Sequence, residues 1–229
     1  MFGVFVNVLT VTVGSLVGLL FKKGIPERVS NAAMIGLGVC TLYIGISGSL
    51  CGANTLIIIA AVVLGAICGT LLDIDGAINR LAVKVESKFQ GVGQRGALAE
   101  GFVSATLLFC VGSMTVTGSI QSGLTGNHSI LITKATLDLV SAMMLASSLG
   151  AGVALSALSV LVIQGGLVLL SGVIAPLMSA GAINEMTCAG SLLIVMIGTN
   201  LMGITKFKVA DYLPAILFAP ILYNIIALF

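Results

Sequence analysis

Long apolar stretches alternate with short polar segments along most of the chain. Each stretch is long enough to cross the hydrocarbon layer of a bilayer as a helix, which takes about 20 residues. The eight stretches cover residues 3 to 21, 31 to 50, 53 to 72, 98 to 118, 130 to 149, 152 to 176, 186 to 205 and 211 to 229. The boundary between the fifth and sixth is the least distinct, so seven spans are the alternative. The pattern predicts one all-α transmembrane domain, a polytopic helical bundle over residues 1 to 229.

The composition narrows the class further. Hydrophobic residues make up 58% of the chain and charged residues 8%, whereas soluble domains carry about 25% charged residues. These values exclude a soluble domain of any size, and a net charge of +2 gives no basis for binding nucleic acid. The five cysteines are scattered and have no neighbouring histidines, so we expect no metal, no cofactor and no disulfide framework.

The basic residues indicate the orientation. They follow the first, third and seventh spans, whereas the loops after the second, fourth and sixth contain no Lys or Arg. Cytoplasmic loops are the ones enriched in Lys and Arg, so we expect both termini outside the cytoplasm. Between spans three and four, apolar residues recur at helical spacing over residues 74 to 90, with basic residues on the other side. This segment predicts an amphipathic cytoplasmic helix at the membrane surface. Docking of a partner or an anionic lipid is the alternative.

An internal repeat is a second prediction. Residues 11 to 46 align without gaps on residues 169 to 204, and the motif TLYIGI at the end of the first copy matches TNLMGI at the end of the second. The aligned loops lie on opposite sides of the membrane by the charge rule. The two copies therefore predict an inverted-topology repeat of spans one to three (3 to 72) and six to eight (152 to 229), around central spans at 98 to 149.

The fourth span contains the polar segment GSMTVTGSIQ, residues 112 to 121. Its hydroxyl side chains alternate along the sequence, which would place all of them on one side of an extended segment. Extended backbone at membrane depth requires protein or a water-filled cavity to satisfy it. We therefore predict an interrupted helix that offers polar groups to a permeant, with a continuous helix as the alternative. The candidate ligands are Ser113, Thr115, Thr117, Ser119 and Gln121.

The fifth span carries two charges. Lys134 and Asp138 lie at i and i+4 on one helix face, and Ser141 continues that face. A carboxylate in the membrane costs about 2.5 to 3.5 kcal/mol on insertion scales, so Asp138 is expected to face protein or water and to have a partner. Two interpretations stay open, a site on an ion pathway and a neutralised pair that only holds helices together.

Other polar residues inside the spans are weaker candidates. Thr41 and Asn200 lie in the matched repeat segments and form a possible symmetric pair of site residues. Asn7 and Gln164 are expected to form ordinary interhelical hydrogen bonds, worth about 0.6 kcal/mol each. Glu185 precedes an apolar run and is expected to be a first-turn acid favoured by the helix dipole.

Two further motifs leave alternatives open. Small-xxx-small spacings at Gly14 and Gly18, and at Gly65 and Gly69, allow close helix contact, which serves a homodimer or the internal bundle equally well. The sequence GISG around Ser47 matches the pattern of an intramembrane serine nucleophile, which requires a base. His128 is the sole histidine. Nothing else in the chain supports a hydrolase, and we do not expect an enzyme.

A family resemblance then follows from two specific stretches. The stretches are FCVGSMTVTGSIQSGLTGNHSILITKATLDLVSA, residues 109 to 142, and FVNVLTVTVGSLVGLLFKKGIPER, residues 5 to 28. Both resemble the YqgA/YdfK-type bacterial membrane family, domain of unknown function 554. The resemblance covers the whole chain and implies a multi-spanning protein of the bacterial cytoplasmic membrane. It brings no activity or substrate.

Three functional hypotheses follow from the sequence. The first is a small transporter or channel for an ion or small metabolite, with its site between the two halves of the repeat. The second is a scaffold or accessory subunit that does not transport. The third, and most remote, is the intramembrane hydrolase.

Overall fold

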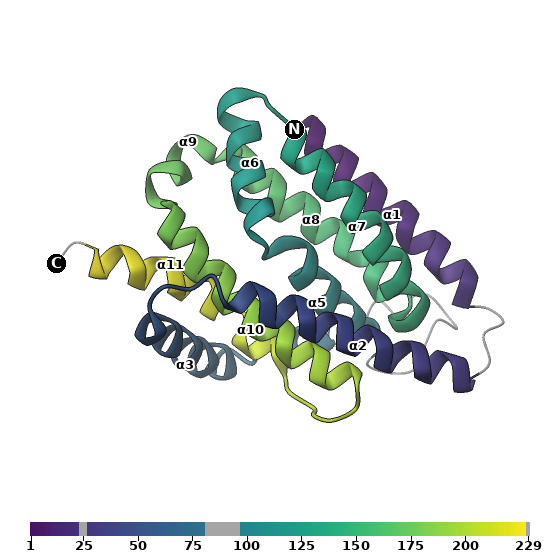
Figure 1. The fold of residues 1–229 in the computed structure, drawn as a ribbon. Helices are drawn as coiled ribbons and strands as arrows, with labels where there is room; N and C mark the ends of the chain where they lie inside the picture. Colours follow the sequence, from purple (N-terminus) through teal and green to yellow (C-terminus); the bar gives the residue numbers. More distant parts are fainter. Residues whose placement is uncertain (23–26, 81–96, 228–229) are drawn as a thin grey trace.

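The computed structural model describes residues 1–22, 27–80 and 97–227, and the regular elements among these residues are helical (Figure 1). The longer helices are α1 (Phe2–Lys22), α2 (Glu27–Ser49), α3 (Thr55–Leu71), α5 (Ala97–Cys110), α6 (Ser113–Thr125), α7 (Ser129–Leu149), α8 (Gly152–Leu169), α10 (Ala180–Leu201) and α11 (Ala215–Ile226). The short elements are a helix at Ile74–Arg80, α9 (Ser171–Ile174) and 3-10 turns at Ala175–Leu177 and Val209–Tyr212. The prediction of an all-α chain is confirmed.

Five helices in the described part are long and apolar enough to cross a membrane. The number of spans rises to seven if each of two bent helix pairs counts as one span. The apolar part of α2, Ile35–Ser49, is shorter. The protein is therefore a helical membrane protein, and the count of eight spans stays a prediction. The expected sixth span is shorter than 152 to 176, because α8 ends at Leu169 and is followed by α9 and a 3-10 turn.

The helices form two groups with α5 and α6 between them (Figure 1). In one group α1 packs against α7 and α8, and in the other α10 packs against α2 and α11, with α3 against α11. The main apolar core lies where these groups meet. Its buried members include Val11 of α1, Phe109 of α5, Leu145 of α7, Val153 of α8 and Leu193 of α10.

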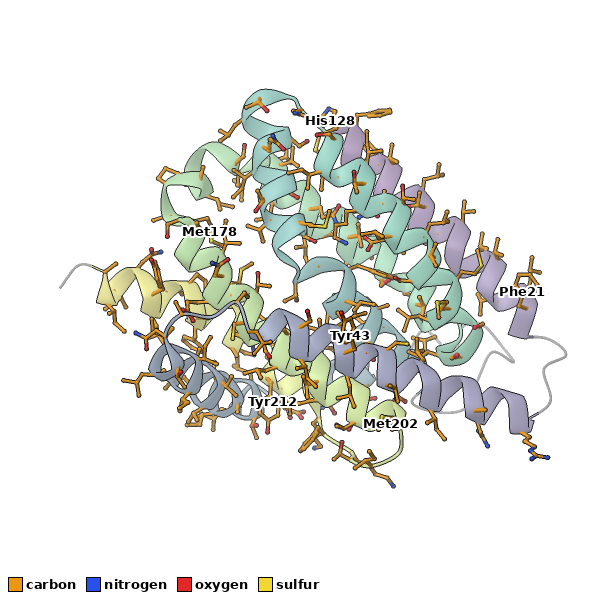
Figure 2. The ribbon with its side chains drawn as sticks, in the orientation of Figure 1. Phe21, Tyr43, His128, Met178, Met202 and Tyr212 are labelled. Carbon is orange, nitrogen blue, oxygen red and sulfur yellow. The ribbon has the colours of Figure 1, made fainter. Side chains whose placement is uncertain are left out.

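The outer surface of the bundle is apolar, as contact with lipid requires. On α1 the exposed side chains include Phe5, Leu9, Leu16 and Leu20, which recur at the spacing of one helix face. At the end of the same helix Phe21 is also exposed (Figure 2). A soluble protein does not expose a continuous apolar face of this kind.

The glycine pairs serve packing inside the bundle. A Cβ atom on Gly14 or Gly18 would overlap the backbone carbonyl of Leu139 or Met143, so α1 and α7 approach with their backbones in contact. Gly65 and Gly69 play the same part where α3 meets Ala215 and Asp211. Because both motifs are used internally, neither supports the homodimer, which stays a prediction.

The fourth span is broken at the start of the predicted segment, but the break is shorter than predicted. Helix α5 ends at Cys110, and α6 begins at Ser113 with its axis bent by 58°. Only the linker is non-helical, with Gly112 in an extended conformation. The predicted extended run of alternating hydroxyls is wrong because the segment from Ser113 onward is helical. A helix satisfies its own backbone groups at membrane depth, and a lone extended segment does not.

The aligned copies of the proposed repeat lie in different local structures. Residues 11 to 22 belong to one continuous helix, whereas their counterparts 169 to 180 pass through the end of α8, α9 and a 3-10 turn. Gly45 is buried within α2, and its counterpart Gly203 lies in a turn with φ of 73°. The inverted repeat therefore stays a prediction from charge and sequence.

The predicted amphipathic helix over residues 74 to 90 is described only in part. Residues Ile74–Arg80 are helical and follow α3 at an angle of 50°. Asp211 Oδ1 accepts a hydrogen bond from the backbone N–H of Asp75 (2.9 Å) and so caps the first turn of this short helix. Residues 81 to 90 of the prediction lie outside the described part of the chain.

Candidate functional site

Helix α7 carries its two charged residues on its buried face. Lys134 and Asp138 lie one turn apart, each with only 5% of its surface exposed, among buried apolar residues such as Leu131 and Ala142. The Lys134 Nζ donates a hydrogen bond to Asp138 Oδ2, and the two groups form an ion pair. Both charges are therefore held inside the bundle and away from lipid.

Two further helices complete the polar cluster. The side-chain amide of Asn7, on α1, donates to Asp138 Oδ2 (2.9 Å) and contacts Gln164 Oε1, on α8 (3.2 Å). Asn7 and Gln164 are fully buried. We call Asn7, Lys134, Asp138 and Gln164 the polar cluster. From the sequence, Asn7 and Gln164 are expected only to form ordinary interhelical hydrogen bonds. Nothing in the sequence shows that α1 and α8 meet α7 at this depth.

Phe109 connects the polar cluster to the break in the fourth span. The ammonium group of Lys134 lies 5.9 Å from the centre of the Phe109 ring, within the range of a cation–π contact. The Phe109 carbonyl, in the last turn of α5, accepts a hydrogen bond from Thr115 Oγ1 (2.9 Å). The last four carbonyls of a helix have no partner within it, so Thr115 of α6 satisfies a group that the break leaves open.

The hydroxyls of the GSMTVTGSIQ segment point in different directions because the segment is helical. Thr115 and Ser119, one turn apart, are fully buried, whereas Thr117 is exposed and Gln121 is half-buried. The side chain of Ser113 lies outside the described part. No hydrogen-bond partner is found among the described residues for Ser119 Oγ, Gln121 Oε1 or Gln164 Nε2. Leaving a buried polar atom unpaired costs about 1–3 kcal/mol, so these atoms favour a polar guest or water.

The remaining predicted site residues are Ser141, Thr41 and Asn200. Ser141 is half-buried on α7. Thr41 Oγ1 donates to the Leu37 carbonyl of its own helix (2.8 Å). Asn200 holds the turn after α10, where its Oδ1 accepts from the Phe207 N–H (2.9 Å). Thr41 and Asn200 each bond within their own segment, and their role as a pair of site residues stays a prediction.

Glu185 has a different role from the one expected. Its carboxylate is fully buried, and Oε1 accepts hydrogen bonds from the backbone N–H groups of Ala53 (2.8 Å) and Asn54 (2.9 Å) at the start of α3. It therefore caps a neighbouring helix and not its own. Backbone donors without intrahelical partners at a helix start explain this preference for an anion.

The histidine considered for the hydrolase hypothesis has another partner. His128 lies just before α7, beside the start of α1, and its ring is 6.0 Å from that of Phe2 (Figure 2). His128 Nδ1 is 2.7 Å from Ser122 Oγ. Ser47, the serine of the GISG motif, is exposed on α2.

A cavity of about 410 Å³ lies where α5 begins and α10 ends. The charge pattern predicts this end of the bundle to be cytoplasmic. The polar residues that line the cavity are Asp75, Asn79, Glu100, Ser104, Asn200, Thr205 and Lys206. Ser104 is five residues before Phe109, about 7.5 Å along α5, so this helix connects the cavity to the polar cluster. Among the described residues no group of three His, Cys, Asp or Glu side chains is arranged to hold a metal ion.

Comparison with known proteins gives one family. Residues 2–224 match the family described as "Protein of unknown function (DUF554)". The chain is 31% identical over its whole length to "Uncharacterized membrane protein YdfK" of Bacillus subtilis, covering 98% of that protein. It is also 31% identical over 95% of its length to "Uncharacterized protein YqgA" of Escherichia coli, covering 94% of that protein. No solved structure matches the chain.

Proposed function

The chain belongs to the DUF554 family of membrane proteins, and we propose that it is a small transporter or channel for an ion or small metabolite. The observation that carries the proposal is the polar cluster. Ionisable side chains inside a membrane are costly, and proteins retain them mainly on substrate, ion or proton pathways. Asp138 and Lys134 form such a pair, buried among three helices.

The pair supplies a site for a cation or proton. With no guest, Lys134 neutralises Asp138 and Asn7 holds the carboxylate in place. An arriving cation competes with Lys134 for Asp138 Oδ2, and the displaced ammonium group stays stabilised over the Phe109 ring. While Lys134 stays charged, a bound cation raises the net charge of the interior by one, so the site holds the cation only transiently.

The broken helix supports a path toward this site. Ser119 Oγ and Gln164 Nε2 are buried groups with unused hydrogen-bonding capacity in the described part, and α5 leads from the cavity at Glu100 and Ser104 to the polar cluster. Discontinuous helices at membrane depth recur in transporters around their binding sites. In this proposal the two halves of the inverted repeat rock about the polar cluster, and the chain lies in the bacterial cytoplasmic membrane with both termini outside.

A scaffold or accessory subunit is the alternative. In that case the polar cluster only holds α1, α7 and α8 together, and no solute crosses. We do not propose an enzymatic activity.

The decisive experiment measures solute flux in the Asp138→Asn variant. The variant and the wild type are purified, reconstituted into liposomes and compared for uptake of candidate cations, protons and small metabolites. We expect flux to be lost while the protein still accumulates and folds. The control is Ser156→Ala, which removes a fully buried hydroxyl that is bonded within α8.

A double variant keeps the proposal testable if Asp138→Asn does not fold. Asp138→Asn with Lys134→Met removes both charges and leaves no buried ion unpaired. A folded double variant without flux supports a pathway. A folded double variant that still transports every solute carried by the wild type shows that the pair is only structural.

A further inference from the structure

Two cysteines from distant parts of the chain meet at one end of the bundle. Cys51 lies in the turn between α2 and α3, and Cys188 lies in α10. The Cys51 thiol donates to the carbonyl of Asn184, one turn before Cys188 (3.3 Å). The Cys188 thiol donates to the carbonyl of Ser49, two residues before Cys51 (3.0 Å). Each thiol therefore contacts the backbone beside the other cysteine.

Gly52 shows how close the two segments are. A Cβ atom on Gly52 would lie 3.0 Å from Cys188 Cβ and 2.8 Å from its Sγ. The turn that carries Cys51 thus runs directly over the Cys188 side chain. These contacts place the backbones of the two segments side by side, which a disulfide requires because its Cα atoms lie about 4.4–6.8 Å apart. Rotation of the two side chains must then bring the sulfur atoms together.

We propose that Cys51 and Cys188 are a modification site, a dithiol that an oxidant of the disulfide class converts to a disulfide joining the α2–α3 turn to α10. The charge pattern places this turn on the outer side of the membrane, and disulfides form and persist in the bacterial periplasm and at cell surfaces. The inference does not depend on transport, because it rests on the contacts of these two side chains and on the orientation that the charge pattern predicts.

The order of the two steps follows from exposure. Cys51 is half-buried and Cys188 is 5% exposed, so the Cys51 thiolate attacks the oxidant first. A mixed disulfide forms at Cys51, and one oxidant sulfur leaves as a thiol. The Cys188 thiolate then attacks Cys51 Sγ and releases the second oxidant thiol. Overall the two cysteines lose two protons and two electrons, and the oxidant disulfide is reduced to two thiols.

The surroundings of Cys51 slow its reaction with small oxidants. Burial and the nearby carboxylate of Glu185 raise the pKa of the Cys51 thiol, while a backbone hydrogen bond opposes them. The thiol is therefore protonated at neutral pH and reacts slowly with small oxidants. A mixed disulfide at Cys51, once formed, has its resolving partner beside it.

The test counts reactive thiols before and after oxidation. The purified full-length protein in detergent is treated with oxidised glutathione at alkaline pH, denatured and labelled with a polyethylene glycol maleimide. The reduced chain carries five thiols, and we expect the oxidised chain to be labelled at three of them. Peptide mapping should find Cys51 linked to Cys188. Five labelled thiols, or a linkage to Cys40, Cys68 or Cys110, would overturn the proposal.

Two variants check the order of the steps. Cys188→Ser should stop at a stable mixed disulfide on Cys51, whereas Cys68→Ser, which removes a half-buried thiol of α3, should cross-link as the wild type does. If these variants fold poorly, the wild type alone still decides, because reducing the oxidised protein should lower its Tm. An unchanged Tm together with an unchanged thiol count contradicts the disulfide.

Discussion

The ammonium group of Lys134 lies 5.9 Å from the centre of the Phe109 ring, so the charged helix α7 and the end of the broken helix α5 meet at one side chain. Phe109 is fully buried, and its carbonyl is bonded to Thr115 at the start of α6. Phe109 therefore links the junction of α5 and α6 to the ion pair. This relationship gives the first prediction.

Replacing Phe109 with Leu should slow transport and also lower stability. The change removes a buried cation–π contact, worth about 2 kcal/mol when desolvated, and keeps an apolar side chain. We expect slower flux per folded protein in liposomes than for Phe102→Leu, which changes a half-buried position of the same helix, together with a larger Tm drop. Flux equal to the wild type would show that the ring does not assist the exchange at Asp138.

Thr115→Val should destabilise the junction of α5 and α6. Valine has nearly the same shape but cannot donate to the Phe109 carbonyl, and a buried acceptor left without a partner costs about 1–3 kcal/mol. Thr115→Ser keeps the donor and should remain close to the wild type. Thr117→Val, at an exposed position, is the matched control and should change the Tm little. Equal Tm values for Thr115→Val and Thr117→Val would contradict this assignment.

Gly14→Leu should prevent assembly of the bundle. Its side chain would overlap the Leu139 carbonyl of α7, and a backbone atom cannot move aside as a flexible side chain can. The same replacement at Gly36, where no atom lies within 4 Å of an added Cβ, should be tolerated. Membrane accumulation of the two variants, measured by fluorescence-detected size exclusion, distinguishes them. Normal accumulation of Gly14→Leu would mean that α1 does not approach α7 so closely.

Glu185→Ala should loosen the start of α3. It leaves the N–H groups of Ala53 and Asn54 without their acceptor, and hydrogen bonds to charged groups contribute about 1.5–3 kcal/mol each. Glu185→Gln retains an oxygen acceptor and should lose less stability. Faster hydrogen exchange at residues 53 to 57 in the alanine variant alone is the expected readout. Equal protection in both variants would exclude the cap.

The labelling rate of Cys51 should rise at higher pH than that of an ordinary thiol. Because the pKa of this thiol is raised, its thiolate fraction is below that of an ordinary cysteine at every pH beneath its pKa. The maleimide labelling rate, followed in Cys188→Ser by mass spectrometry, should therefore rise about tenfold per pH unit and continue to rise above about pH 8.5, where the labelling rate of an ordinary free thiol levels off near its pKa. A plateau at pH 8.5 would show that burial does not control the thiol.

The sequence by itself determined the class of the protein and the identity of its buried charges. Long apolar runs can only be satisfied as helices in lipid, and the i, i+4 spacing of Lys134 and Asp138 places them on one face of any helix. The polar segment of the fourth span likewise predicted that its helix would be interrupted. These conclusions depend on local geometry, which is the same wherever the helix lies.

Only the tertiary structure decided which groups meet. Asn7 is 131 residues from Asp138 and 157 residues from Gln164 along the chain. No local spacing in the sequence indicates that such distant residues are in contact. The same holds for the cap that Glu185 provides to α3 and for the approach of Cys51 to Cys188. The hydroxyls of the fourth span face different directions from those predicted. Because the backbone at membrane depth forms its own hydrogen bonds, the segment is helical from Ser113. In a helix, side chains two residues apart do not share a face.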